Sequence, residues 1–263
     1  MTRINRHQLM SEFRSPGANE GDMILIRASL GAVGRIESSA DTFINALLDA
    51  VGNNGTIVSL AFTSGSFFRK PKVEDAFTIN KKSYAGALPN AMLSRVDSFR
   101  SMHPMCSFVA IGKQADLITQ DHDANSPAYE PVRKIVEANG KCILVGCARS
   151  SPGFTTTHLA EADLGYLKKL PILPWLNSTF YIDRDGETKL FRRYDPGLCS
   201  KSFSKFYSLY VEEEILSTGY IGKAYSILAP AEKAYDIDIK KLREDKKFNI
   251  CGNSDCRTCN AGR

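Results

Sequence analysis

A histidine and a glutamate in the middle of the chain have the spacing of an acid–base pair. His158 and Glu161 lie three residues apart, and side chains at that spacing lie on one face of a helix. An imidazole titrates near neutral pH, so His158 suits a general base, and a carboxylate at Glu161 would orient the ring and stabilise its charged form. From these two residues alone, a solvated His–Glu pair at the start of a helix is the competing interpretation.

Three cysteines near the end of the chain have a spacing typical of metal sites. Cys251, Cys256 and Cys259 form the pattern C-x4-C-x2-C, with glycine, asparagine and serine between them, which suit tight loops. Three thiolates bind zinc when a fourth ligand completes the site, and Cys199 or a histidine is the candidate for that ligand. We expect zinc here; the alternatives are an iron–sulfur cluster and a flexible tail with unligated thiols. The other cysteines lie in apolar segments and are expected in the core: Cys106, Cys142 and Cys147.

The remaining histidines have less informative surroundings. His103 precedes Pro104, and a residue before proline favours an extended backbone. It is expected either in the wall of a site or in the interior as a structural residue. His7 and His122 lie in polar stretches and are expected at the surface.

The elements that must position these residues alternate between strands and helices in the first part of the chain. The apolar run at residues 23–26 predicts a buried strand. Residues 41–51 place their apolar side chains on one helical face, and residues 56–62 predict the next strand. A strand–helix–strand order is typical of an α/β fold with at least one parallel strand pair.

Further elements are expected along the rest of the chain. An Asp-Gly pair at 185–186 stands between two strand-like runs and predicts a hairpin, 179–182 with 189–191. The predicted fold is α/β, with a mixed, partly parallel central sheet flanked by helices and a hairpin-rich C-terminal part. We divide the chain into an α/β domain at 1–248 and a cysteine-rich tail at 249–263. The other predicted helices are 86–95, 113–118, 131–138, 202–213 and 230–245, and the other strands are 106–111, 142–145 and 220–228.

Residues 19–161 resemble the aminoglycoside 3-N-acetyltransferase family, whose members use acetyl-CoA. Four short stretches in a specific order and spacing carry the resemblance: Ser-Leu-Gly-Ala-Val-Gly at 29–34, Gly-Ala-Leu-Pro at 86–89, Arg-Ser-Met-His-Pro-Met-Cys-Ser-Phe at 100–108, and Thr-Thr-Thr-His-Leu-Ala-Glu at 155–161. The resemblance implies that His158 is the catalytic base and that Glu161 supports it. A solvated surface pair then becomes the weaker interpretation.

The resemblance also implies where the two substrates bind. The turn at 29–34 is expected to hold coenzyme A, since small residues there let backbone N–H groups approach a phosphate or a pantetheine amide. The implied coenzyme A residues are Ser29, Leu30, Gly31, Gly34, Thr63 and Ser107. On the acceptor side we expect His103, together with Asn90, which stands where the family frequently has a glutamate.

The charge of the chain bears on the acceptor. The 263 residues include 34 Lys and Arg against 29 Asp and Glu, a formal net charge of +5. Enzymes that bind polycationic aminoglycosides tend to offer clustered carboxylates, so a basic chain favours an anionic acceptor. We therefore expect a nucleotide-linked amino sugar of surface-polysaccharide biosynthesis. The alternatives are an aminoglycoside 3-N-acetyltransferase that confers antibiotic resistance, and a non-catalytic family member that binds a partner through its cysteine-rich tail.

Other partners and the cellular location follow from composition. An odd count of seven cysteines argues against a secreted disulfide scaffold, and no run approaches the ~20 apolar residues of a membrane span. The N-terminus lacks the apolar run of a signal peptide, so a cytoplasmic protein without a membrane partner is expected. The basic residues do not form runs, which argues against nucleic acid. Assembly of identical copies is left open.

Overall fold

The structure, a computed structural model, describes residues 3–38, 40–167, 169–173, 175–197, 199–256 and 259. A mixed seven-stranded sheet forms the centre of this part of the chain. The strand order is β3-β4-β2-β1-β5-β9-β8. The central strand β1 pairs in parallel with β2 and β5, and the other pairs are antiparallel, which confirms the predicted fold class. The strands are β1 (Met23–Ala28), β2 (Thr56–Leu60), β3 (Phe99–Arg100), β4 (Phe108–Gly112), β5 (Lys141–Val145), β8 (Ser217–Ile221) and β9 (Ala224–Pro230).

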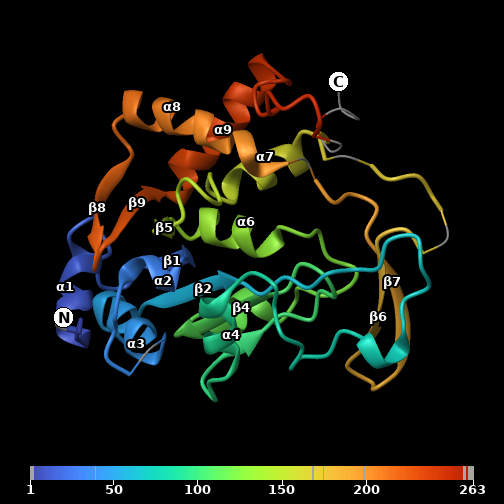
Figure 1. Cartoon of the computed structure of the whole chain (residues 1–263), viewed down its shortest axis with the longest axis horizontal. Coiled ribbons are helices and arrows are strands. Elements are labelled where there is room, and N and C mark those ends of the chain that lie inside the picture. Colours follow the sequence, from blue (N-terminus) through green and yellow to red (C-terminus); the bar gives the residue numbers. More distant parts are fainter. Residues whose placement is uncertain are drawn as a thin grey trace.

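Helices cover both faces of this sheet, which explains why its central strands are continuous apolar runs. Along β1, Met23 and Leu25 belong to the core on one face, and Ile24 and Ile26 to the core on the other. One core contains the apolar sides of α1 (Arg6–Arg14), α3 (Ala40–Val51) and α4 (Ala87–Leu93). The opposite core contains those of α5 (Ala115–Thr119), α6 (Glu130–Glu137), α7 (Thr156–Asp163), α8 (Phe206–Glu212) and α9 (Ala231–Glu244). Figure 1 shows α3 and α4 on one side of the sheet and α6 to α9 on the other.

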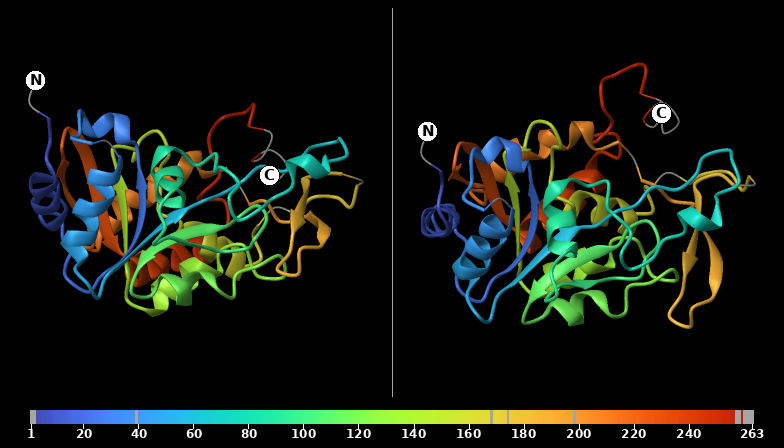
Figure 2. Two further views of the ribbon diagram at one scale, coloured as in Figure 1. Left: turned by 90° about the horizontal axis from the view of Figure 1, so that it is seen from below. Right: turned by 60° about the horizontal axis from the view of Figure 1, so that its bottom comes forward.

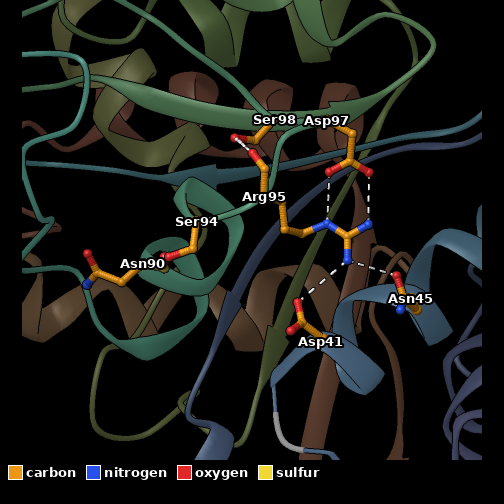
Figure 3. Close-up of polar contacts among 7 residues, drawn as sticks. All are labelled: Asp41, Asn45, Asn90, Ser94, Arg95, Asp97 and Ser98. Carbon is orange, nitrogen blue, oxygen red and sulfur yellow. Dashed lines mark hydrogen bonds and ion pairs between the residues drawn. The ribbon is translucent and has the colours of Figure 1, made fainter.

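An arginine fixes α4 and the segment after it to α3. The Arg95 guanidinium forms two hydrogen bonds with the Asp97 carboxylate, at 2.9 and 2.8 Å, and donates a third to Asn45 Oδ1 at 3.0 Å (Figure 3). An ion pair of 3.6 Å joins it to Asp41 at the start of α3. In the same view the side chain of Asn90 points away from this cluster.

The hairpin predicted around Asp185-Gly186 is present. Strands β6 (Ser178–Ile182) and β7 (Thr188–Arg192) form a separate two-stranded sheet, and Gly186 takes a positive φ of 83° in the turn. Both views of Figure 2 place this hairpin at the end of the molecule opposite the N-terminus.

Two other predicted elements are wrong in detail. The single strand expected at 220–228 is a second hairpin, β8–β9, which reverses at Gly222. Gly222 has a φ of 59°, and a Cβ there would lie 2.3 Å from the carbonyl oxygen of Val33, so the turn needs glycine. The helix expected at 202–213 is divided into a 3-10 helix η2 (Ser200–Lys205) and α8.

The described helices are too short or too polar to cross a membrane.

Candidate active site

A cavity of about 470 Å³ opens at the carboxyl ends of the parallel strands. Arg27 and Ala28 end β1, Ser59 and Leu60 end β2, and Cys147 follows β5; all five line the cavity. Ligands of open α/β sheets bind at this edge because side chains from neighbouring parallel strands converge there. Later segments of the chain supply further lining residues: Tyr129, Thr155, His158, Arg193, Pro196, Ser200 and Phe203.

The His158–Glu161 pair predicted from spacing forms on α7. Nδ1 of His158 lies 2.7 Å from Oε2 of Glu161, and the glutamate side chain is fully buried while the histidine side chain is 18% exposed. Because Nδ1 is bonded to Glu161, Nε2 is the nitrogen available to a ligand in the cavity. The pair therefore has the geometry of a base and the carboxylate that orients it.

Two aromatic rings hold the imidazole in place. The ring of Tyr129 stacks on His158 with centroids 5.1 Å apart, and the ring of Phe203 meets it edge-on at 4.7 Å. Arg193 donates from Nη2 to the Tyr129 hydroxyl at 3.3 Å, which fixes Tyr129 in turn. The imidazole is thus held in one orientation on both sides.

Of the residues expected at coenzyme A, Ser29 lines the cavity. It precedes α2 (Leu30–Val33), and its side chain makes no cap bond to that helix. Leu30 and Gly31 lie in α2 and Gly34 ends it, all three outside the cavity lining. Arg27, just before Ser29, lies in the lining and donates from Nη1 to the carbonyl of Gly153 at 2.9 Å.

Thr63 and Ser107, also expected at the coenzyme, lie outside the cavity lining. The Ser107 hydroxyl is fully buried; it donates to the carbonyl of Ala61 at 2.7 Å and accepts from Arg100 Nε at 3.1 Å. Thr63 is buried and donates to the carbonyl of Pro104. Ser107 thus binds the main chain just after β2 and Thr63 the main chain before β4, and neither joins Ser29 in the cavity lining.

His103 is buried beside a second histidine. Its Nδ1 accepts from the backbone N–H groups of Met105 and Cys106 at 3.2 and 2.9 Å, and its ring stacks on His122 at 5.0 Å. Burial lowers the pKa of His103 well below its usual value. It lines a different cavity, behind Arg193, and so lies apart from His158.

The expectation that His122 lies at the surface is wrong. Its side chain is fully buried, its Nδ1 bonds to the Ser101 hydroxyl at 2.9 Å, and burial lowers its pKa to about 4. The polar residues around it mislead because Gln120, Asp121 and Asn125 are exposed while the His122 side chain is buried.

Asn90 is occupied by the main chain. Its amide donates to the carbonyls of Ser83 and Gly86 at 2.8 and 2.7 Å and accepts from the Ser83 N–H at 2.9 Å. These three hydrogen bonds fix the loop that carries Tyr84. Tyr84 lines the cavity, whereas Asn90 lies outside the lining.

Comparison with known proteins decides the family. The model of the aminoglycoside 3-N-acetyltransferase family matches residues 25–243, most of the chain and well beyond the stretch that carries the sequence resemblance. The chain belongs to this family. It is therefore an acetyl-CoA-dependent N-acetyltransferase, as the resemblance implies.

Individual relatives agree with this assignment. The enzyme is 29% identical over 213 residues to aminoglycoside N(3)-acetyltransferase III of Salmonella sp, covering 72% of this chain and 71% of the relative. It is 28% identical over 176 residues to the type VII enzyme of Streptomyces paromomycinus, covering 60% of each. Solved structures share the fold. The apoenzyme of AAC(3)-IVa has a TM-score of 0.83 and 22% sequence identity, over 100% of this chain and 98% of that one. The AAC-IIIb structure with CoASH has a TM-score of 0.77 and 24% sequence identity, over 96% of this chain and 100% of that one.

The acceptor expected from the net charge is wrong. The curated relatives are named for aminoglycosides, and solved relatives of the same fold hold a gentamicin and sisomicin. These names favour the aminoglycoside alternative over a nucleotide-linked amino sugar. The net charge of +5 sums the whole chain, whereas acceptor recognition depends on the groups near the cavity.

Sequence reasoning missed one buried carboxylate, Asp238, which contacts α7. Asp238 on α9 accepts from the hydroxyls of Thr156 and Thr157 at 2.8 and 3.0 Å and from Tyr210 at 2.5 Å. Burial raises its pKa to about 7, and the three hydrogen bonds oppose that shift. A signal was present in the sequence, because Asp238 occupies a place in the apolar stripe of α9, with the buried positions Ala231, Ala234, Asp238 and Leu242.

The structure brings the four cysteines of the predicted metal site together. The Sγ atoms of Cys199, Cys251, Cys256 and Cys259 all lie within 4.8 Å of one another. A tetrahedral Zn–S distance of about 2.3 Å places sulfur atoms roughly 3.8 Å apart, so the cluster fits one ion after small movements.

The cysteines expected in the core are all buried, as predicted: Cys106, Cys142 and Cys147. Burial raises the pKa of the Cys147 thiol although the residue lines the cavity, which argues against a nucleophilic thiolate there.

Proposed function

We propose that the enzyme transfers the acetyl group of acetyl-CoA to the 3-amino group of an aminoglycoside, with His158 as general base. The observation that carries this proposal is the 2.7 Å bond between His158 Nδ1 and the buried Glu161 carboxylate, in a cavity at the carboxyl ends of the parallel strands. The names of the curated relatives support the acceptor class and the position. Modification of the amine would confer resistance to the drug.

The chemistry is a direct transfer. A bound ammonium group first loses one proton to solvent and gains a lone pair. As this nitrogen attacks the thioester carbonyl carbon, Nε2 of His158 takes a second proton from it, and Nδ1–H donates to Glu161. The carbon–sulfur bond then breaks, and the proton on Nε2 passes to the departing sulfur of coenzyme A. His158 returns to its neutral form, so one base serves both proton transfers.

The acceptor is tested by a panel of aminoglycosides. Gentamicin, sisomicin and apramycin are offered with acetyl-CoA, and thiol release is followed together with the site of acetylation by NMR. We expect turnover with acetylation at the 3-amino nitrogen. Gentamicin already acetylated there is the control and should release no thiol. Absence of thiol release with every acceptor, or acetylation at another nitrogen, would contradict the proposal.

Replacing Ser29 with tryptophan is expected to weaken acetyl-CoA binding by about tenfold or more, a loss of at least ~1.4 kcal/mol. Ser29 lines the cavity at the end of β1, so an indole ring there would fill space that the cosubstrate needs. Calorimetry with the unreactive thioether analogue of acetyl-CoA measures the affinity. Ser29→Ala is the matched control, because the serine side chain makes no cap bond, and it should bind within about twofold of the parent. An unchanged affinity in Ser29→Trp would remove this turn from the cosubstrate site.

We also propose that Cys199, Cys251, Cys256 and Cys259 bind one zinc ion, which joins the tail from residue 249 to the α/β domain of residues 1–248. The proximity of the four sulfur atoms supports this. Two backbone N–H groups support it as well: that of Lys201 donates to Cys199 Sγ at 3.4 Å, and that of Cys251 donates to Cys259 Sγ at 3.5 Å. Such N–H···S bonds stabilise metal-bound thiolates. Native mass spectrometry is expected to find one zinc per chain; a metal-free chain carrying disulfides among these cysteines would exclude the site.

A further inference from the structure

The cysteine cluster joins two segments that each contact one member of the catalytic pair. Phe203, four residues after Cys199, packs its ring edge-on against the His158 imidazole at 4.7 Å. Asn249, two residues before Cys251, donates from Nδ2 to Oε1 of Glu161. The two segments are about fifty residues apart in sequence, so a bond between them at the cysteines would cross-link parts of the chain that are distant in sequence.

The same two segments are also bonded to each other between the cysteines and the pair. The Ser202 hydroxyl donates to the carbonyl of Asn249, and Lys205 Nζ donates to the carbonyls of Phe248 and Ile250 at 3.0 and 3.1 Å. Asn249 is 1% exposed. Its backbone and its side chain are therefore held at the same time, one by η2 and the other by α7.

Glu161 needs both of its partners. The side chain is fully buried, and a buried carboxylate is costly unless each oxygen has a hydrogen-bond donor. Oε2 receives Nδ1–H of His158 and Oε1 receives the amide of Asn249. Without Asn249 one oxygen loses its donor, and the carboxylate can rotate away from the imidazole that it orients.

We propose that a tetrathiolate zinc centre holds Asn249 and Phe203 against the catalytic pair, so that zinc governs the acetyl-transfer rate through position alone. Asn249 is a positioning residue in this arrangement, since it acts on His158 through Glu161. The proposal rests on the acetyl transfer proposed above. It deepens that function by assigning a role to the tail, whose described residues, 249–256 and 259, lie outside the cavity lining.

The test compares four variants of the full chain, purified with zinc. Asn249→Ala should retain zinc and lose about 10–100-fold in kcat, the range found for groups that orient a ligand or base from behind, with KM for acetyl-CoA within about twofold. Cys256→Ser should lose zinc and show the same pattern. The double variant should be no slower than the worse single one, because both act through the same contact. Lys247→Ala, an exposed neighbour in the same segment, is the control and should match the parent.

Amide hydrogen exchange supplies a readout that does not depend on turnover. Zinc removal by a chelator should speed exchange at 199–206 and 248–251 and in α7, leave α3 unchanged, and be reversed by added zinc. Full kcat in both single variants, additive losses in the double variant, or exchange that is unchanged on zinc removal would each overturn the proposal. If instead the zinc-loaded parent acetylates no aminoglycoside, the proposed function fails, and the exchange pattern still decides whether zinc orders the site.

Discussion

Replacing His158 with alanine is expected to lower kcat by about 10²–10⁴-fold, the contribution of a positioned general base. Nε2 is the only ring nitrogen left for the acceptor once Nδ1 is bonded to Glu161, so alanine removes the proton acceptor and leaves Oε2 of the buried carboxylate without its imidazole donor. The acetyl-CoA affinity should change little, because Arg27 and Ser29 line the cavity at the end of β1, on another element. Steady-state kinetics at saturating acceptor, with calorimetry for acetyl-CoA, separate the two effects.

The control for this prediction is His7→Ala. His7 lies exposed on α1 and does not line the cavity, so its loss removes an imidazole without touching the site. Thermal unfolding should confirm that both variants are folded. If His158→Ala retains more than about a tenth of the parent kcat, far above the loss expected of a general base, another group removes the proton and the assignment fails.

Much of the fold could be predicted because its signals are local. The apolar run at 23–26 is a strand buried on both faces, and Asp185-Gly186 turns the predicted hairpin. The hairpin at Gly222 could not be predicted, because its turn residues, Gly222 and Lys223, lack a strong dipeptide signal. Position 222 requires glycine because it packs against the carbonyl of Val33, which is distant in sequence.

The candidate site was predictable only where its residues are close in sequence. His158 and Glu161 are three residues apart on one helix, and three of the four cysteines lie within nine residues. Asn249 and Asp238 act on α7 from 81 or more residues away, and no local pattern pairs them with it. Ser107 and Thr63 show the reverse case, since the family resemblance places them near the coenzyme while their hydroxyls bind the main chain outside the cavity lining.

The net charge of the chain led to a wrong prediction of the acceptor class. A net charge sums all 34 basic and 29 acidic residues and does not say which of them lie near the acceptor. Arg27 and Arg193 both line the cavity, although the curated relatives are named for a polycationic acceptor, so the sign of the net charge does not identify the acceptor.

The buried carboxylate of Asp238 should make the stability of the enzyme depend on pH. Its pKa is about 7 in the folded chain because of burial, against an ordinary value of 3.8. The unfolded chain therefore releases this proton near pH 4, whereas the folded chain keeps it until near pH 7. Between these values the folded state binds more protons, so raising the pH favours unfolding. The stability contributed by the protonated group is complete below about pH 4 and is lost as the pH rises through 7, a change of up to about 4 kcal/mol.

Asp238→Asn is expected to abolish this part of the pH profile, because an amide does not titrate. Urea unfolding at intervals from about pH 4 to pH 8 should show the difference in stability between variant and parent moving in favour of the variant by up to about 4 kcal/mol. Asp236→Asn removes an exposed carboxylate from the same helix and should leave the profile of the parent unchanged. Parallel profiles for the parent and Asp238→Asn would mean that the carboxylate is ionised throughout. In that case its three hydroxyl partners, Thr156, Thr157 and Tyr210, outweigh the cost of burial, and α7 is anchored by a permanent charge.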